Sequence, residues 1–162
     1  MGDGSYGGGM RIVRVRPGDE QLVLDAAVLF DAPPDRGWTS KFLAEPGHHL
    51  LLAYVDDVVA GFVSGVETTH PDKGTEMFLY ELAVDEPFRR QGVAKALVTA
   101  LTEIAIDAGC YGMWVGTEAD NVAALATYAS TGADPPEPSV TLTWRFDNSE
   151  DRSAESREDR VS

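Results

Sequence analysis

The chain has 162 residues, of which 13 are Lys or Arg and 27 are Asp or Glu, so its formal net charge at pH 7 is −14. This length suits one domain with a sizeable core, and no apolar run approaches the roughly 18 residues that a membrane-spanning helix needs. An acidic surface repels nucleic acid and attracts small cations, although acidity also serves solubility alone.

The acidic residues are spread over the whole chain. Residues 10–146 hold twenty acids and ten bases, and residues 147–162 hold six acids and three arginines. We therefore predict a flexible leader over residues 1–9, one domain over residues 10–146 and a disordered acidic tail over residues 147–162. The leader lacks the basic and apolar regions of a secretory signal, and the single cysteine, Cys110, cannot form an internal disulfide. Both features favour a cytoplasmic location.

The first part of the domain is predicted to hold one strand and two helices. Residues 11–16 alternate in polarity as a half-buried strand does, and residues 19–30 place apolar side chains on one helical face. A shorter helix follows over residues 38–44. Asp31 and Asp35 lie in the proline-containing loop between the helices, and each is either a surface acid or a substrate contact.

Three strands are predicted next. Residues 50–55 and 58–68 are apolar and are joined by a tight two-aspartate turn, and a third strand follows over residues 76–84. Glu81 lies in the middle of this third strand, where burying an isolated charge is costly. Its carboxylate is therefore either paired with a structural arginine or functional.

A basic turn and a helix follow the third strand. Residues 89–94 read Arg-Arg-Gln-Gly-Val-Ala, and apolar residues recur at helical spacing over residues 93–108. Small residues at Gly92 and Ala94 let the backbone approach a ligand, and a helix start offers unpaired N–H groups at the positive end of its dipole. The segment predicts a pyrophosphate cradle, with an ordinary helix start as the alternative.

The last part of the domain is predicted to hold two strands around one helix. The strands cover residues 111–115 and 141–146, and the helix has an N-cap at Asn121 and a terminating glycine at Gly132. Tyr128 lies on this helix, where a tyrosine is most often a packed aromatic with a hydrogen-bonded hydroxyl. Trp38, Phe42 and Trp144 are expected in the core and not at a ligand site.

Two of these segments resemble the acetyl-CoA signature of the GNAT N-acetyltransferase superfamily. Residues 89–94 match its [RQ]-x-x-G-x-[GA] motif, and residues 121–132 match its N-x-x-A-x-x-x-Y segment with a helix-ending glycine. The resemblance implies an α/β (α+β) GNAT fold, a mixed and mostly antiparallel central sheet of six to seven strands flanked by about four helices. It also implies acetyl-CoA (coenzyme A) as the cofactor and allows a homodimer, which is common among members.

The resemblance assigns roles to individual residues. The pantetheine arm would lie along the strand before the turn and near Asn121. Tyr128 would be the acid that protonates the departing thiolate. The cofactor-binding residues implied on the strand and the turn are Leu82, Ala83, Val84, Arg89, Arg90, Gln91, Gly92, Val93 and Ala94.

The strand around Glu81 resembles that of the GNAT-type aminoglycoside 3-N-acetyltransferases. In that subfamily an acid precedes Leu-Ala-Val and contacts the amine that is acetylated, so Glu81 would be the base. The resemblance implies an aminoglycoside acceptor, acetylation at the 3-amino group and antibiotic resistance. This chain departs from the pattern with Glu81 in place of aspartate and Ala133 in place of phenylalanine. The substrate-binding residues implied or suggested are Asp31, Asp35, Tyr80, Glu81, Glu118 and Asp120.

Two other functions stay open. The acceptor could instead be a polyamine, a peptide or a small metabolite amine, because one fold serves many acceptors. The chain could also be a non-enzymatic CoA-binding module, although a mere binder needs neither Glu81 nor Tyr128. No metal site is predicted, because His48 and His49 are adjacent and His70 is isolated.

Overall fold

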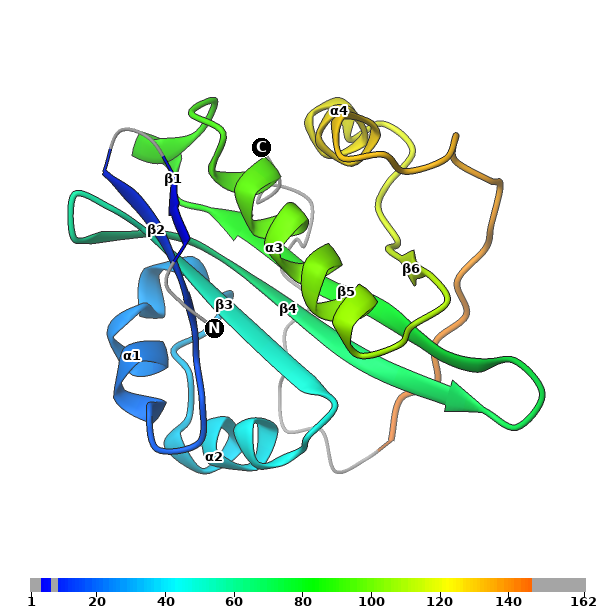
Figure 1. Ribbon diagram of the computed structural model, residues 1–162, viewed down its shortest axis with the longest axis horizontal. Helices are drawn as coiled ribbons and strands as arrows, with labels where there is room; N and C mark the ends of the chain where they lie inside the picture. Colours follow the sequence, from blue (N-terminus) through cyan, green and yellow to red (C-terminus); the bar gives the residue numbers. More distant parts are fainter. Residues whose placement is uncertain (1–3, 7–8, 147–162) are drawn as a thin grey trace.

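The computed structural model describes residues 4–6 and 9–146 (Figure 1). In these ranges six strands form one sheet in the order β1-β2-β3-β4-β5-β6. All neighbouring strands are antiparallel except β5 and β6, which are parallel. The strands are β1 (Gly4–Tyr6), β2 (Met10–Arg14), β3 (His48–Val55), β4 (Val58–His70), β5 (Gly74–Val84) and β6 (Met113–Trp114).

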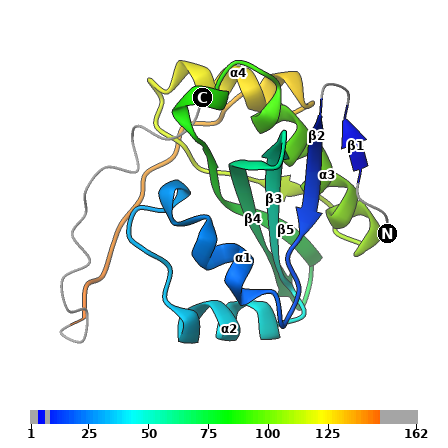
Figure 2. The ribbon, with the colours of Figure 1, turned by 90° about the vertical axis from the view of Figure 1, so that its left-hand side faces the viewer.

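Helices cover both faces of this sheet, and two apolar clusters fill the layers between (Figure 2). Leu97 of α3 and Tyr128 of α4 belong to the cluster on one face, and Val23 of α1 and Leu43 of α2 belong to the cluster on the other. This arrangement confirms the predicted fold class. The helices are α1 (Glu20–Asp25), α2 (Arg36–Ala44), α3 (Val93–Asp107) and α4 (Val122–Ser130), with short 3₁₀ helices η1 (Ala27–Leu29) and η2 (Glu86–Phe88).

Most element ends lie where local residues predict them. The β3–β4 turn consists of Asp56 and Asp57, whose φ angles of 48° and 64° suit a two-residue hairpin. Gly109 and Gly132 follow α3 and α4 with φ angles of 78° and 98°, as helix-terminating glycines do. The first predicted helix is shorter than expected, because α1 ends at Asp25 and a separate 3₁₀ turn follows.

Both ends of the domain differ from the prediction. Residues 4–6 were expected in a flexible leader, but they form β1 and pair with residues 10–12 of β2. Residues 141–146 were expected to be the last strand, but they form no strand in the described part of the chain. The predicted tail, residues 147–162, lies outside the described residues.

One register irregularity changes which face each side chain of β5 occupies. Ser64 pairs with Glu81, whereas the next residue of β4, Gly65, pairs with Leu79. Tyr80 is therefore the extra residue of a β-bulge. Because of this bulge, Leu79 and Leu82 both pack on the α3 face of the sheet.

None of the helices in the described ranges is both long and apolar enough to cross a membrane.

Candidate active site

The candidate site lies where β5 and β6 separate. The parallel pairing of these strands is limited to Met77 with Met113 and Phe78 with Trp114. Beyond this point residues 81–84 of β5 pair with β4 on one side only. The other edge of this stretch, in the described structure, has no strand beside it, and its backbone N–H and C=O groups can bind an extended ligand as an added strand.

The turn between the end of β5 and the start of α3 has the geometry of an anion-binding site, which we call the cradle. The chain leaves β5 through η2 and enters α3 at Gly92, whose φ of 81° is left-handed, and Arg90 is also left-handed with φ of 61°. No side chain caps the N-terminus of α3, so its first N–H groups stay available for a ligand. A left-handed φ suits glycine, which explains the residue at position 92.

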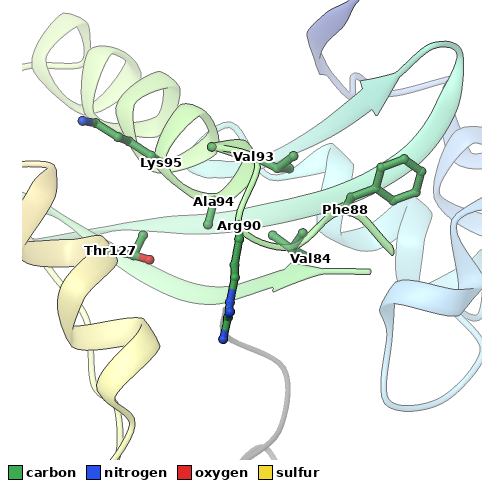
Figure 3. A pocket seen from close by; sticks show the side chains of 8 residues that line it. Val84, Phe88, Arg90, Val93, Ala94, Lys95 and Thr127 are labelled. Atoms are coloured by element: carbon green, nitrogen blue, oxygen red, sulfur yellow. The ribbon is translucent and has the colours of Figure 1, made fainter. Parts of the chain in front are cut away.

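A pocket of about 100 Å³ lies at this cradle (Figure 3). It is formed by the end of β5, the turn, the first turn of α3 and Thr127 of α4. Of its lining residues, the sequence predicted Val84 and the turn but missed Phe88, Lys95 and Thr127. Lys95 carried a signal that could have been used, because it is a cation in the first turn after Gly92. The lining residues are Val84, Phe88, Arg90, Gly92, Val93, Ala94, Lys95 and Thr127.

Two predicted cofactor side chains are engaged within the turn. The Arg89 guanidinium donates to the Val84 carbonyl at 3.2 Å, and the Gln91 amide donates to the Pro87 carbonyl at 2.9 Å. These bonds tie the turn to the end of β5 and fix its shape. The groups of the turn that are left to contact an anion are backbone N–H groups and the exposed cations Arg90 and Lys95.

Glu81 lies on the sheet face that α1 and α2 cover. It stands directly opposite Ser64, and the next pairs along the strands are Leu82 with Val63 on the α3 face and Ala83 with Phe62 on the α1/α2 face. Directly opposed residues share a face, so Glu81 and Ser64 share the α1/α2 face. Glu81 is half-buried, and Ser64 is 6% exposed.

Tyr128 lies on the opposite face, in the cluster that α3 and α4 form over the sheet. Its side chain is 7% exposed, and burial raises its pKa from 10 to about 12. Its hydroxyl has no hydrogen-bond partner among the described residues. Tyr128 is thus a protonated donor at neutral pH, and the open edge of β5 separates it from Glu81.

The predicted residues ahead of α4 divide into a cap and two exposed acids. The Asn121 side-chain oxygen accepts from the Ala124 N–H at 3.1 Å, which confirms the predicted N-cap. Its amide nitrogen remains a potential donor to a ligand. Glu118 and Asp120 are exposed in the preceding loop, where their backbone carbonyls accept hydrogen bonds from Asn121 and Val122.

The loop after η1 begins over the same face as Glu81. The Phe30 ring stacks on Phe62 with centroids 4.3 Å apart, and Phe62 pairs with Ala83 in the sheet. Asp31 and Asp35 follow Phe30 and are exposed. The Asp35 carboxylate accepts from the Trp38 N–H at 2.8 Å and so caps α2, a structural role that the sequence analysis did not assign.

Sequence reasoning named Tyr80 beside Glu81, but it missed the two other rings of an aromatic surface there, Phe78 and Trp114. Phe78 stacks on Trp114 with ring centroids 4.2 Å apart, and it meets Tyr80 edge-on at 5.5 Å. Trp114 is 49% exposed and Tyr80 is 55% exposed. The three rings come from two strands that only the folded sheet brings together. Trp38 and Trp144 were expected in the core, but both are mainly exposed.

A second polar cluster is structural. His49 is 4% exposed and lies between Arg14, 2.8 Å from its Nδ1, and Glu67, 2.7 Å from its Nε2. Arginine can only donate, so Nδ1 accepts and the Nε2–H donates to Glu67. The three residues join β2, β3 and β4. The described ranges contain no group of three His, Cys, Asp or Glu arranged to hold a metal ion.

The chain is similar in sequence to known acetyltransferases. A family model described as the acetyltransferase (GNAT) family matches residues 20–133. Human N-acetyltransferase 8 is 31% identical over 107 residues, which are 65% of this chain and 47% of that protein. The N-acetyltransferase YycN of Bacillus subtilis is 34% identical over 118 residues, which are 72% of this chain and 70% of that protein. The chain spans about half the length of the human and rat relatives that it matches.

Solved structures share the fold. A crystal structure of an aminoglycoside acetyltransferase from an uncultured soil metagenomic sample, in complex with sisomicin, superposes with a TM-score of 0.75 at 21% identity. The match covers 85% of this chain and 97% of that one. The aminoglycoside N-acetyltransferase AAC(6')-Iy in complex with CoA gives a TM-score of 0.73 at 21% identity, covering 87% of this chain and 98% of that one.

Proposed function

The chain belongs to the GNAT family of acetyltransferases, and from that premise we propose that it acetylates an aminoglycoside at its 3-amino group and so confers resistance. The family uses acetyl-CoA as the acetyl donor, which makes acetyl-CoA the cofactor of this chain. The observation that carries the proposal is the open edge of β5, with the Glu81 carboxylate on one sheet face and the Tyr128 hydroxyl on the other.

The residues where β5 and β6 separate fit acetyl-CoA. An uncapped helix N-terminus with two exposed cations, Arg90 and Lys95, suits a pyrophosphate. The edge of residues 81–84 that has no described strand beside it suits the amide groups of a pantetheine arm. Bound acetyl-CoA supplies the acetyl group as a thioester. The left-handed Gly92 keeps the cradle open, because the site where its Cβ would stand has no protein atom within 4 Å.

The chain's own groups supply the proton transfers. Glu81 takes a proton from the acceptor amine on the α1/α2 face, because an amine attacks only when neutral. Tyr128 keeps its proton on the hydroxyl oxygen at neutral pH and donates it on the α4 face, since burial raises its pKa to about 12. The two groups thus work from opposite sides of one open strand edge.

Acidic side chains support a cationic acceptor. Glu118 and Asp120 lie before α4, Asp31 follows Phe30, and all three are exposed. Carboxylates attract the several ammonium groups of an aminoglycoside more strongly in a cleft than in bulk water. A cytoplasmic location belongs to the same proposal, supported by the single thiol at Cys110.

The aromatic surface favours a second candidate acceptor. Phe78, Tyr80 and Trp114 lie on the face that holds Glu81, and exposed aromatic side chains suit an apolar partner. A peptide N-terminus with an apolar first side chain is therefore the runner-up. Glu81 and Tyr128 would serve this acceptor in the same way.

A single assay separates these acceptors. Thiol release from acetyl-CoA is followed with a panel of aminoglycosides, a polyamine and peptides that differ in their first residue, and products are located by mass spectrometry and NMR. We expect turnover with aminoglycosides and one acetyl group on the 3-amino nitrogen. Acetylation at the 6'-amino group would reject the regiochemistry, and turnover with peptides alone would reject the aminoglycoside. Calorimetric CoA binding without any turnover would indicate a binding module.

A further inference from the structure

Ser64 carries a buried hydroxyl that the fold itself does not use. It is 6% exposed and is one of three buried polar side chains among the described residues. The other two are bonded, since the Thr39 hydroxyl donates to the Asp35 carbonyl at 2.7 Å and both ring nitrogens of His49 have partners. Within the described ranges the Ser64 hydroxyl makes no hydrogen bond. Because an unpaired buried hydroxyl is costly, its presence points to a role outside the fold.

The neighbours of Ser64 on its sheet face are apolar with one exception. Leu50 of β3 and Glu81 of β5 stand directly opposite it, one on each side. Phe62 and Val66 flank it along β4, because alternate residues of a strand share a face. Directly opposed residues have Cβ atoms about 4.5–5.5 Å apart, a spacing that the long side chain of a glutamate can cross. Glu81 is therefore the polar side chain that the sheet places beside this hydroxyl.

The bulge at Tyr80 creates the pair. Gly65 pairs with Leu79, so a regular register would place Tyr80 opposite Ser64. The extra residue brings Glu81 to this position instead. The register of β4 and β5 thus joins a buried hydroxyl without a partner to the carboxylate of the proposed base.

We propose that the Ser64 hydroxyl donates a hydrogen bond to the Glu81 carboxylate, and that Ser64 is a positioning residue for the base. This role rests on the proposed function of Glu81. A rotamer change of Glu81 is enough to form the bond, and such changes are fast. A hydrogen bond from a hydroxyl to a carboxylate is charge-assisted and about twice as strong as a neutral one. It keeps the carboxylate ionised and holds its other oxygen towards the amine.

A matched pair of variants isolates the hydroxyl. Ser64→Thr keeps it, and Ser64→Val replaces it by a methyl group in a side chain of the same shape, which suits a strand equally well. Strain from the added atoms is common to both variants. We expect Ser64→Val to have about tenfold lower kcat than Ser64→Thr, with an unchanged KM for acetyl-CoA, because a hydrogen bond to a charged group is lost. Equal kcat values would overturn the proposal.

A double-mutant cycle shows whether Ser64 acts through Glu81. In a Glu81→Gln background the two variants at position 64 should differ by less than about twofold, since no carboxylate remains to be positioned. An undiminished difference would mean that the hydroxyl acts on the acceptor or on the fold, and it would overturn the proposal. Thr102→Val is the control, because it removes a hydroxyl bonded to the Val98 carbonyl of α3 at 2.8 Å, and it should keep parent-like kcat.

Carbon-13 NMR titration of the glutamate carboxyl groups detects the contact without any acceptor. The Glu81 signal is the one that Glu81→Gln removes. We expect the pKa of Glu81 to be about one pH unit higher in Ser64→Val than in Ser64→Thr, because the hydrogen bond favours the ionised carboxylate. The acidic limb of kcat/KM against pH should move upwards with it.

The titration also separates this inference from the proposed function. Equal pKa values of Glu81 in the two variants would overturn the role of Ser64 whatever the acceptor is. A raised pKa in Ser64→Val together with full turnover of Glu81→Gln would support the contact and would reject only Glu81 as the base.

Discussion

The position of Glu81 depends on one bulged residue. In a regular strand Leu79 and Glu81 would share a face, which would place the carboxylate among the apolar side chains under α3. The bulge at Tyr80 moves Glu81 to the α1/α2 face, opposite Ser64. Bulges that re-aim a side chain are frequent next to active sites, which is the use proposed for this one.

Replacement of the Glu81 carboxylate tests its role as base. We expect Glu81→Gln to lower kcat by about 100-fold or more, because general-base catalysis contributes about 10²- to 10⁴-fold. CoA affinity, measured by calorimetry, should stay unchanged. Glu103→Gln on the exposed side of α3 is the matched control and should keep full turnover. Parent-like turnover of Glu81→Gln at every pH would assign proton removal to another group.

Burial of the Tyr128 side chain couples stability to alkaline pH. Its pKa is about 12 in the folded protein and about 10 when exposed, so the folded state holds this proton more tightly. The resulting stability is fully present below pH 10 and is lost as the pH rises towards 12. By pH 11 the parent should lose about 1.4 kcal/mol of unfolding free energy that Tyr128→Phe does not lose.

Urea unfolding of both proteins at pH 8 and pH 11 measures this difference. Other groups that titrate in this range contribute equally to the two proteins and cancel in the comparison. An identical pH dependence would mean that the hydroxyl is solvated in the folded state. Turnover of Tyr128→Phe at pH 8 is measured alongside and should fall, because the variant has no hydroxyl proton to donate.

At the scale of elements, the start of α3 combines a structural and a binding role. Gly92 and Gly109 flank the same helix, both have φ near 80°, and a Cβ at either position would meet no protein atom within 4 Å. An alanine at either position costs about 1–2 kcal/mol through its left-handed backbone. Gly92 is the N-cap of α3 and borders the candidate anion cradle, whereas Gly109 follows the other end of the helix and lies outside that pocket.

This pair isolates the contribution of the cradle to cofactor binding. We expect Gly92→Ala and Gly109→Ala to lower the thermal midpoint by similar amounts. Only Gly92→Ala should weaken CoA binding, by about tenfold or more, the cost of disturbing a hydrogen bond to a charged group. Calorimetric titration with CoA gives the affinity. Equal affinities for the two variants would place the pyrophosphate elsewhere.

At the scale of the molecule, the net charge of −14 should increase the association rate of a cationic acceptor. Screening shortens the reach of exposed charges from about 30 Å at 0.01 M salt to about 10 Å at 0.1 M. For a multiply charged aminoglycoside, kcat/KM should therefore fall by about tenfold or more as the salt concentration rises through and above this range. For a monoamine, kcat/KM should fall much less. Steady-state rates at constant pH test this expectation.

A variant pair localises the charge effect. Glu118→Gln/Asp120→Asn should raise KM for an aminoglycoside more than for a monoamine. Asp56→Asn/Asp57→Asn changes the net charge equally at the β3–β4 turn, where asparagine also tolerates a positive φ. This control should leave both KM values nearly unchanged. Equal effects of the two double variants would show that only the overall charge matters.

The sequence by itself determined the parts whose geometry is set by neighbouring residues. The turn at residues 89–94, the Asn121 cap and the glycines after α3 and α4 were all predicted, because caps and left-handed positions depend on a few consecutive residues. The same local signals predicted the order of the elements from β2 to α4, and the resemblance that residues 89–94 and 121–132 carry implied the fold class. These features locate the cradle without any knowledge of long-range contacts.

Only the tertiary structure decided what depends on pairing between distant segments. The bulge at Tyr80 follows from the register of β5 against β4, and the ring stack of Phe78 on Trp114 follows from a two-residue pairing across the α3 crossover. Residues 141–146 have a strand pattern but form no strand of the described sheet. An alternating pattern predicts that one face of a strand is buried. Which segment covers that face depends on contacts with residues far away in the chain.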